Sequence, residues 1–142
     1  MRTLYRLWVN LVVLKVTTMK DELFMLFTQD GQNKINVYDV NDWEEVKDVI
    51  ALPGISPSDI EGCSVSDCVY ALCKNVDETS ASVLRITKDE EQRLNVQPWI
   101  SNLRYPAATI FVSATGVLSV PNGAEPDSVS IYDANGSLVF EC

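Results

Sequence analysis

The stretch "LKVTTMKDELFMLFTQDGQNKINVYDVNDWEEVKDVI", Leu14 to Ile50, contains four short strand-like runs separated by polar turns. The second run, LFMLF, is entirely apolar, which is typical of a strand that is buried on both faces. The same order of runs recurs in "CSVSDCVYALCKNVDETSASVLRITKDEEQRLNVQPWI" from Cys63 and in "FVSATGVLSVPNGAEPDSVSIYDANGSLVFEC" from Phe111. The sequence therefore predicts three copies of one four-stranded unit.

The spacing of the copies is regular. Asp21 aligns with Asp67 at a shift of 46 residues, whereas Val37, Leu84 and Ile131 align at shifts of 47. A period in the forties with four short strands per repeat indicates a β-propeller blade. We expect an all-β fold of three consecutive four-stranded antiparallel propeller blades in a single domain, residues 1–142. The approximate blades are 11–52, 60–100 and 108–142, and residues 1–10 are compatible with a strand of a preceding blade.

Charged residues mark the expected fourth strand of the first two repeats. They are Glu44, Glu45, Lys47 and Asp48 in the first repeat and Glu90, Glu91 and Arg93 in the second. The outermost strand of a blade is a sheet edge that faces solvent, and charges there oppose edge-to-edge pairing.

The corner "IYDANG", Ile131 to Gly136, resembles the hydrophobic–Tyr/Phe–Asp–x–x–Gly corner of NHL-type β-propeller repeats. The related "VYDVND", Val37 to Asp42, lacks the glycine, and neither the WD dipeptide nor the kelch double glycine occurs. The resemblance to NHL- and WD-like propellers spans roughly residues 11–142. It implies an interaction module, because NHL-like propellers often end multidomain proteins of the tripartite-motif type, where they bind protein or RNA.

Three repeats are fewer than the ~4–8 blades of a closed propeller. Three explanations follow: a part of a longer propeller chain, two copies that complete a six-bladed ring, or an open stack with exposed end faces. The first is favoured because terminal repeats normally differ from internal ones and carry caps, whereas these repeats do not.

Composition narrows the classes of function. The 142 residues carry a net charge of −9, and the 11 lysines and arginines form no basic patch, so we expect no nucleic-acid partner. The absence of histidine excludes Ser–His and Cys–His nucleophiles, and we expect no enzyme activity and no cofactor.

The N-terminal region favours a strand over a secretory signal, which stays the less favoured alternative. Asn10 and Lys15 interrupt and end its apolar run, which is too short for a secretory signal or a membrane span. We therefore expect a buried strand pair there, a cytoplasmic location and no membrane association.

The Asp-rich corners resemble the start of a calcium loop, but the twelfth position counted from Asp39 is Ile50, not a carboxylate. Asp and Asn also favour turns, which is the preferred interpretation, and no metal site is expected. Cys63, Cys68 and Cys73 lack zinc-ligand spacing and are expected to be buried thiols, with an interstrand disulfide left open.

The segment "QPWISNLRYPA", Gln97 to Ala107, is expected to be the longest connection without a clear strand. Its Trp99, Arg104 and Tyr105 are residue types enriched at binding hot spots. Trp43 is a fourth candidate, and core packing is the alternative for both tryptophans.

The expected function is a non-catalytic scaffold or interaction module that binds protein or peptide through loops on one face. It acts alone, as a homodimer that completes a ring, or within a longer chain. The alternative is a propeller hydrolase or lactonase, fragment or oligomer. It is disfavoured because the expected inner strands supply no Asp, Glu or His; these strands are Leu14–Thr18, Cys63–Ser66 and Phe111–Ala114.

Overall fold

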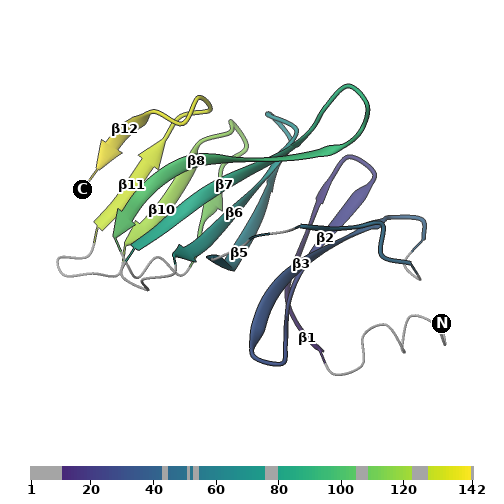
Figure 1. The fold of residues 1–142 in the computed structure, drawn as a ribbon. Coiled ribbons are helices and arrows are strands. Elements are labelled where there is room, and N and C mark those ends of the chain that lie inside the picture. The colour runs from purple at the N-terminus through teal and green to yellow at the C-terminus, as the bar shows by residue number, and fades with distance from the viewer. Residues whose placement is uncertain are drawn as a thin grey trace.

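The chain forms three four-stranded antiparallel sheets, arranged in chain order in the computed structural model (Figure 1). The structure describes residues 11–42, 45–50, 52, 55–75, 80–104, 109–122 and 128–141. Within these ranges every regular element is a strand, and none of the three sheets closes on itself.

Each sheet is a meander in which neighbours in sequence pair in space. The first sheet contains β1 (Leu11–Met19), β2 (Glu22–Gln29), β3 (Gln32–Asp39) and β4 (Asp48–Ile50). The second contains β5 (Ile55–Cys63), β6 (Cys68–Asn75), β7 (Ser80–Lys88) and β8 (Leu94–Arg104). The third contains β9 (Phe111–Val112), β10 (Leu118–Asn122), β11 (Ser128–Tyr132) and β12 (Leu138–Glu141).

Local sequence sets the two-residue turn between β2 and β3. Gln29 pairs with Gln32, so only Asp30 and Gly31 connect β2 to β3. Both have positive φ, 53° and 77°, as a two-residue turn of type I′ requires. Asp-Gly is a preferred dipeptide for that turn, because its twist matches the twist of the flanking strands.

In the first two sheets, alternate residues belong to two different cores. Phe24, Leu26, Ile35 and Val37 of the first sheet pack on Val69, Ala71, Leu84 and Ile86 of the second. Tyr70, Leu72 and Val83, on the opposite face of the second sheet, pack with Leu118, Val120 and Tyr132 of the third. We call the face toward the following sheet the front and the opposite face the rear, so each seam is front against rear.

The first strands of the sheets lie next to one another. β1 contacts β5, and β5 contacts β9. We call these three the inner strands. An irregularity interrupts the β1–β2 register between Val13 and Lys15, and another interrupts β5–β6 between Pro57 and Asp59. The first two sheets therefore share a β-bulge at the same place, which makes Val16 and Ile60 equivalent.

The predicted repeat is confirmed at the level of sheets. The apolar runs LFMLF and VYALC lie in β2 and β6, and VLSV lies in β10 from Leu118 onward; β3, β7 and β11 follow as the third strand of each sheet. Strand pairing changes one alignment: Phe24 faces Val37 and Tyr70 faces Arg85, so the equivalent of Val37 is Arg85 and not Leu84. Ile131 remains the equivalent of Val37 in the third sheet.

Three local expectations were wrong. The charged residues at 45–47 and 89–93 lie in turns that precede β4 and β8, because these strands begin at Asp48 and Leu94. Residues 97–104 are not a connection but part of β8. The inner strand of the second sheet is Ile55–Cys63, which comes before the segment expected for it and carries Asp59 and Glu61.

The expected burial near the N-terminus is also wrong where the structure describes it. Val12, Val13 and Leu14 of β1 are 61%, 41% and 49% exposed. β1 is an edge strand of the first sheet, so one side of it has no hydrogen-bonded neighbour in that sheet. Residues 1–10 lie outside the described ranges.

Candidate interaction surface

Four turns share one hydrogen-bonded construction. Asp133 Oδ1 accepts hydrogen bonds from the amides of Asn135 and Ser137 at 2.9 and 3.0 Å. Asp89 Oδ1 accepts from Glu91 and Arg93, both at 2.9 Å. In each turn the side chain of the first residue satisfies backbone donors that the strands leave unpaired, as in an Asx turn.

The β9–β10 and β3–β4 turns have the same construction. Ser113 Oγ accepts from the amides of Thr115 and Val117 at 3.2 and 3.1 Å. Asp39 Oδ1 accepts a hydrogen bond from the Asn41 amide at 2.8 Å. The turn interpretation of the two Asp-rich corners is therefore confirmed. Asp89 plays the same role in the second sheet, whereas the alignment of Leu84 with Val37 placed Ile86 at the position of Asp39.

These turns gather at one end of the sheets. Glu22 pairs with both Met19 and Asp39, so the β1–β2 and β3–β4 turns are neighbours. Leu118 likewise pairs with both Val112 and Tyr132 in the third sheet. A hollow of about 410 Å³ lies where the β1–β2 and β5–β6 turns meet, lined by residues that include Lys20 and Asp67. We call this end, formed by the β1–β2, β3–β4, β5–β6, β7–β8, β9–β10 and β11–β12 turns, the turn end.

The turn end is acidic. Its described acidic residues are Asp21, Asp39, Asp42, Glu45, Asp67, Asp89, Glu90, Glu91 and Asp133, and its described basic residues are Lys20, Lys47, Lys88 and Arg93. Two of these cations are held by a carboxylate that is itself buried: Glu22, 3% exposed, pairs with Lys88 and, at 2.9 Å, with Lys47. Carboxylates therefore dominate the solvent-facing part of this end.

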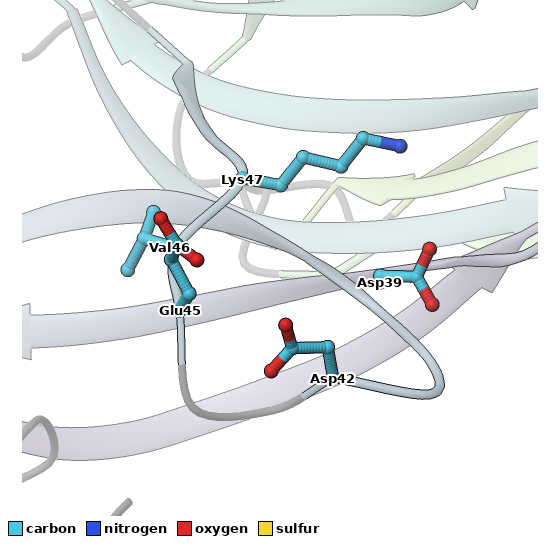
Figure 2. A pocket seen from close by; sticks show the side chains of 5 residues that line it. All are labelled: Asp39, Asp42, Glu45, Val46 and Lys47. Atoms are coloured by element: carbon cyan, nitrogen blue, oxygen red, sulfur yellow. The ribbon is translucent and has the colours of Figure 1, made fainter. Parts of the chain in front are cut away.

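The β3–β4 connection adds a hollow of about 300 Å³. Asp39, Asp42, Glu45, Val46 and Lys47 line it (Figure 2). A hydrogen bond to Glu22 raises the pKa of Lys47, against the smaller effect of desolvation. Among the described residues no three His, Cys, Asp or Glu side chains are grouped to hold a metal ion.

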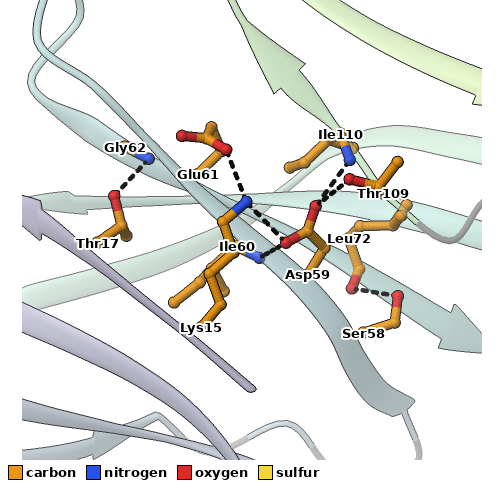
Figure 3. A network of polar contacts seen from close by, with 10 residues as sticks. All are labelled: Lys15, Thr17, Ser58, Asp59, Ile60, Glu61, Gly62, Leu72, Thr109 and Ile110. Carbon is orange, nitrogen blue, oxygen red and sulfur yellow. Dashed lines mark hydrogen bonds and ion pairs between the residues drawn. The ribbon is translucent and has the colours of Figure 1, made fainter. Parts of the chain in front are cut away.

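A second polar cluster lies between the inner strands (Figure 3). Lys15 Nζ reaches from β1 to Asp59 Oδ1 at 3.0 Å and to Glu61 Oε2 at 2.7 Å. Burial lowers the pKa of Lys15, but its hydrogen bonds to Glu61 and Asp59 outweigh that effect and leave the pKa raised.

Asp59 also binds the segment that leads into the third sheet. Its Oδ2 accepts hydrogen bonds from the Thr109 hydroxyl and from the Ile110 amide, both at 2.8 Å. Asp59 is 6% exposed, so one buried carboxylate connects all three sheets. Sequence inspection missed it because nothing near Asp59 in the chain marks its partners.

The predicted binding residues have different environments. Trp99 is partly buried against the core between the second and third sheets. The Arg85 guanidinium lies 4.6 Å from the centre of its ring, and a Cβ built on Gly136 would lie 3.0 Å from the indole. Trp99 thus fills the seam, as the packing alternative expected.

The structure describes less of the other three candidate binding residues. Arg104 ends β8, where its backbone pairs with Ser80, and its side chain lies outside the description. Trp43 and Tyr105 lie outside the described residues. Of the four predicted residues, Trp99 is the one whose side chain falls within the described part of the structure.

The three cysteines that the structure describes are buried thiols. Cys63, Cys68 and Cys73 are free, and Cys63 pairs directly with Cys68 across the β5–β6 register. Burial raises the pKa of Cys68, and it raises the pKa of Cys73 to about 12. Both thiols therefore stay protonated near neutral pH.

Comparisons with known proteins add no family assignment. No protein-family model matches the chain, and no curated protein matches its sequence. In the part of the chain that the structure describes, no helix is long and apolar enough to cross a membrane.

Proposed function

We propose that this chain is a non-catalytic, propeller-type interaction module that binds a protein or peptide partner through its turn end. The partner's binding segment is basic, because it must complement the carboxylates gathered there. The observation that carries the proposal is the acidic turn end itself, in which side-chain hydrogen bonds hold the turns of all three sheets.

The propeller-type arrangement is supported by the packing of the sheets. Their inner strands are neighbours, the equivalent residues Phe24 and Tyr70 each pack toward the following sheet, and the first two sheets share a β-bulge. These are the relations expected between successive blades, each a four-stranded meander.

The binding role is supported by rigidity and charge together. Turns fixed by their own side chains lose little conformational entropy when a partner binds, which favours affinity. The negative electrostatic field of the turn-end carboxylates also speeds the encounter with a positively charged partner.

The alternative hydrolase or lactonase function draws on Asp59 and Glu61, the carboxylates of the inner strand β5. Both oxygens of Asp59 already accept hydrogen bonds from protein groups. Glu61 is paired with Lys15. This occupancy supports a structural role for the pair and the non-catalytic proposal.

Calorimetric titration with a Lys/Arg-rich peptide tests the proposal. We expect saturable binding that weakens as NaCl is raised from 50 to 300 mM, because salt screens exposed charges. Glu45→Gln and Glu90→Gln each remove one exposed turn-end charge and should weaken binding roughly two- to fivefold, the effect of a single exposed ion pair.

The matched control is Asp30→Asn, which makes the same charge change at the opposite end of the first sheet. Asn tolerates the positive φ of that position, 53°, so the fold is preserved. Equal weakening by Asp30→Asn and Glu90→Gln would show that only net charge matters and would contradict a turn-end site.

A further inference from the structure

Two cysteines close the β5–β6 hairpin at the turn end. Cys63, the last residue of β5, and Cys68, the first residue of β6, are direct partners in the antiparallel register. Partners of this kind point to the same face of a sheet, and both thiols belong to the core between the second and third sheets. The turn between them runs from Ser64 to Asp67. The two thiols are therefore neighbours in space as well as in register.

The placement of this pair meets the requirements of a disulfide. Directly paired Cα atoms of antiparallel strands lie about 4.5–5.5 Å apart, within the roughly 4.4–6.8 Å that a disulfide spans. The two sulfur atoms can therefore join while the backbone keeps its register. Cys73 belongs instead to the core between the first and second sheets, so the second sheet separates its thiol from the pair.

Two donors face the sulfur of Cys68. Tyr70 follows it on β6 by two residues, and Arg85 of β7 pairs directly with Tyr70. Among the described residues, neither the buried Tyr70 hydroxyl nor the buried Arg85 Nε has a hydrogen-bond partner. Burial raises the pKa of Cys68, and hydrogen bonds from Tyr70 and Arg85 to its deprotonated sulfur oppose that effect. The seam thus holds donors that a thiolate at Cys68 would satisfy.

We propose that Cys63 and Cys68 are a dithiol redox site, which a small-molecule disulfide such as oxidised glutathione converts reversibly into a disulfide. The Cys63 thiolate attacks one sulfur of the oxidant, forms a mixed disulfide and releases one small thiolate. The Cys68 thiolate, held by Tyr70 and Arg85, then attacks the Cys63 sulfur and displaces the second small thiolate. Two electrons pass from the protein to the oxidant, and the two cysteine protons end on the released thiols.

The oxidant reaches the pair through the turn. Ser64, Val65 and Asp67 are exposed, so opening of the hairpin end alone uncovers the pair. Cys63 is placed first because it keeps a small exposed fraction, 4%, whereas Cys68 has none. This inference does not depend on the binding of a basic partner.

A redox titration tests the proposal in the Cys142→Ser variant, which removes the cysteine outside the described residues. The protein is equilibrated in glutathione buffers, native or unfolded in urea, then acid-quenched and analysed by mass spectrometry. We expect the native protein to lose about 2 Da, the two hydrogens of the new disulfide, at Cys63 and Cys68. It should do so at a smaller share of oxidised glutathione than the unfolded chain needs, because folding holds the thiols together. Cys73→Ala is the matched control and should keep this bond.

Two further variants test the order of attack. Cys68→Ser should accumulate glutathione on Cys63, because no second thiol resolves the mixed disulfide. Tyr70→Phe should slow disulfide formation severalfold and leave its final extent unchanged, because the hydroxyl acts on the thiolate. Circular dichroism verifies that each variant is folded, and Cys68→Ala is the milder replacement.

Three results would overturn the proposal. The first is an equal need for oxidised glutathione in the native and the unfolded protein. The second is a native disulfide that includes Cys73. The third is a Cys68→Ser protein that is folded but takes up no glutathione on Cys63.

Discussion

The Nζ atom of Lys15 lies 3.0 Å from Oδ1 of Asp59, and this ion pair joins the inner strand of the first sheet to that of the second. The other oxygen of Asp59 binds Thr109 and Ile110 at the start of the third sheet. The cohesion of three separate sheets therefore depends in part on one buried carboxylate.

Asp59→Asn should lower the free energy of unfolding by about 2 kcal/mol, the usual effect of losing hydrogen bonds to a buried charged group. Lys15 is one-third exposed, so we assign most of the loss to the contacts with Thr109 and Ile110. Urea denaturation measures it. Glu61→Gln, which alters the more exposed partner of Lys15, should cost less than about 1 kcal/mol. Equal losses in the two variants would refute the central role of Asp59.

Gly62 permits the close approach of β5 to β1. A Cβ at this position would lie 2.6 Å from the Thr18 carbonyl oxygen and 2.8 Å from Thr17 Oγ1, which accepts a hydrogen bond from the Gly62 amide. Gly62→Ala should therefore destabilise the protein by about 1–3 kcal/mol, as overpacking does. In thermal melts, Gly31→Asn should lower the melting temperature less than Gly62→Ala does. Gly31 has open space around it, and Asn tolerates its positive φ. An unchanged melting temperature for Gly62→Ala would mean that β1 and β5 are not in this contact.

The turn at Asp133 offers a test of the shared turn construction. Asp133→Ala removes the acceptor for two amides and should cost about 1 kcal/mol. Asp133→Ser should retain most of the stability, because Ser113 accepts the same two hydrogen bonds in the β9–β10 turn. The measurement is the urea midpoint of each variant. Equal losses in the Ala and Ser variants would count against a side-chain acceptor in this turn.

The thiol of Cys73 predicts a dependence of stability on alkaline pH. Burial raises its pKa from 9.0 to about 12, so above pH 9 the unfolded chain loses this proton before the folded protein does. The stabilisation is complete below pH 9 and should fall by about 1.4 kcal/mol per pH unit above it. Urea unfolding of the reduced protein at pH 8, 9 and 10 measures the slope. Cys73→Ala should be less stable at pH 8 but flatter above pH 9, whereas parallel curves would contradict the buried thiol.

The sequence predicted those features that depend on local pattern. Apolar runs located β2, β6 and β10, and the spacing of Val37 and Ile131 identified equivalent corners. The alignment failed at Arg85 because β7 extends two residues further before its turn, so Asp89 follows Arg85 by four residues while Asp39 follows Val37 by two.

The candidate site was less accessible to sequence inspection. The role of Asp59 depends on Lys15 and Ile110, which are 44 and 51 residues away, and no local pattern encodes such a contact. Trp99 was predicted to lie in a connection, but the strand β8 continues through it and turns its ring into a seam. The acidic charge was evident from composition, whereas its concentration at one end became visible only when the turns were placed.

Binding through the turn end is the central claim, and amide chemical shifts in a ¹⁵N-labelled sample titrated with a Lys/Arg-rich peptide test it most directly. We predict saturable shifts at Asn41, Glu91 and Asn135, whose amides bind the turn aspartates. Amides near Asp30 and Gly31, at the opposite end, should not change. Shifts concentrated at Asp30 and Gly31, or no saturable shifts at low salt, would contradict the claim.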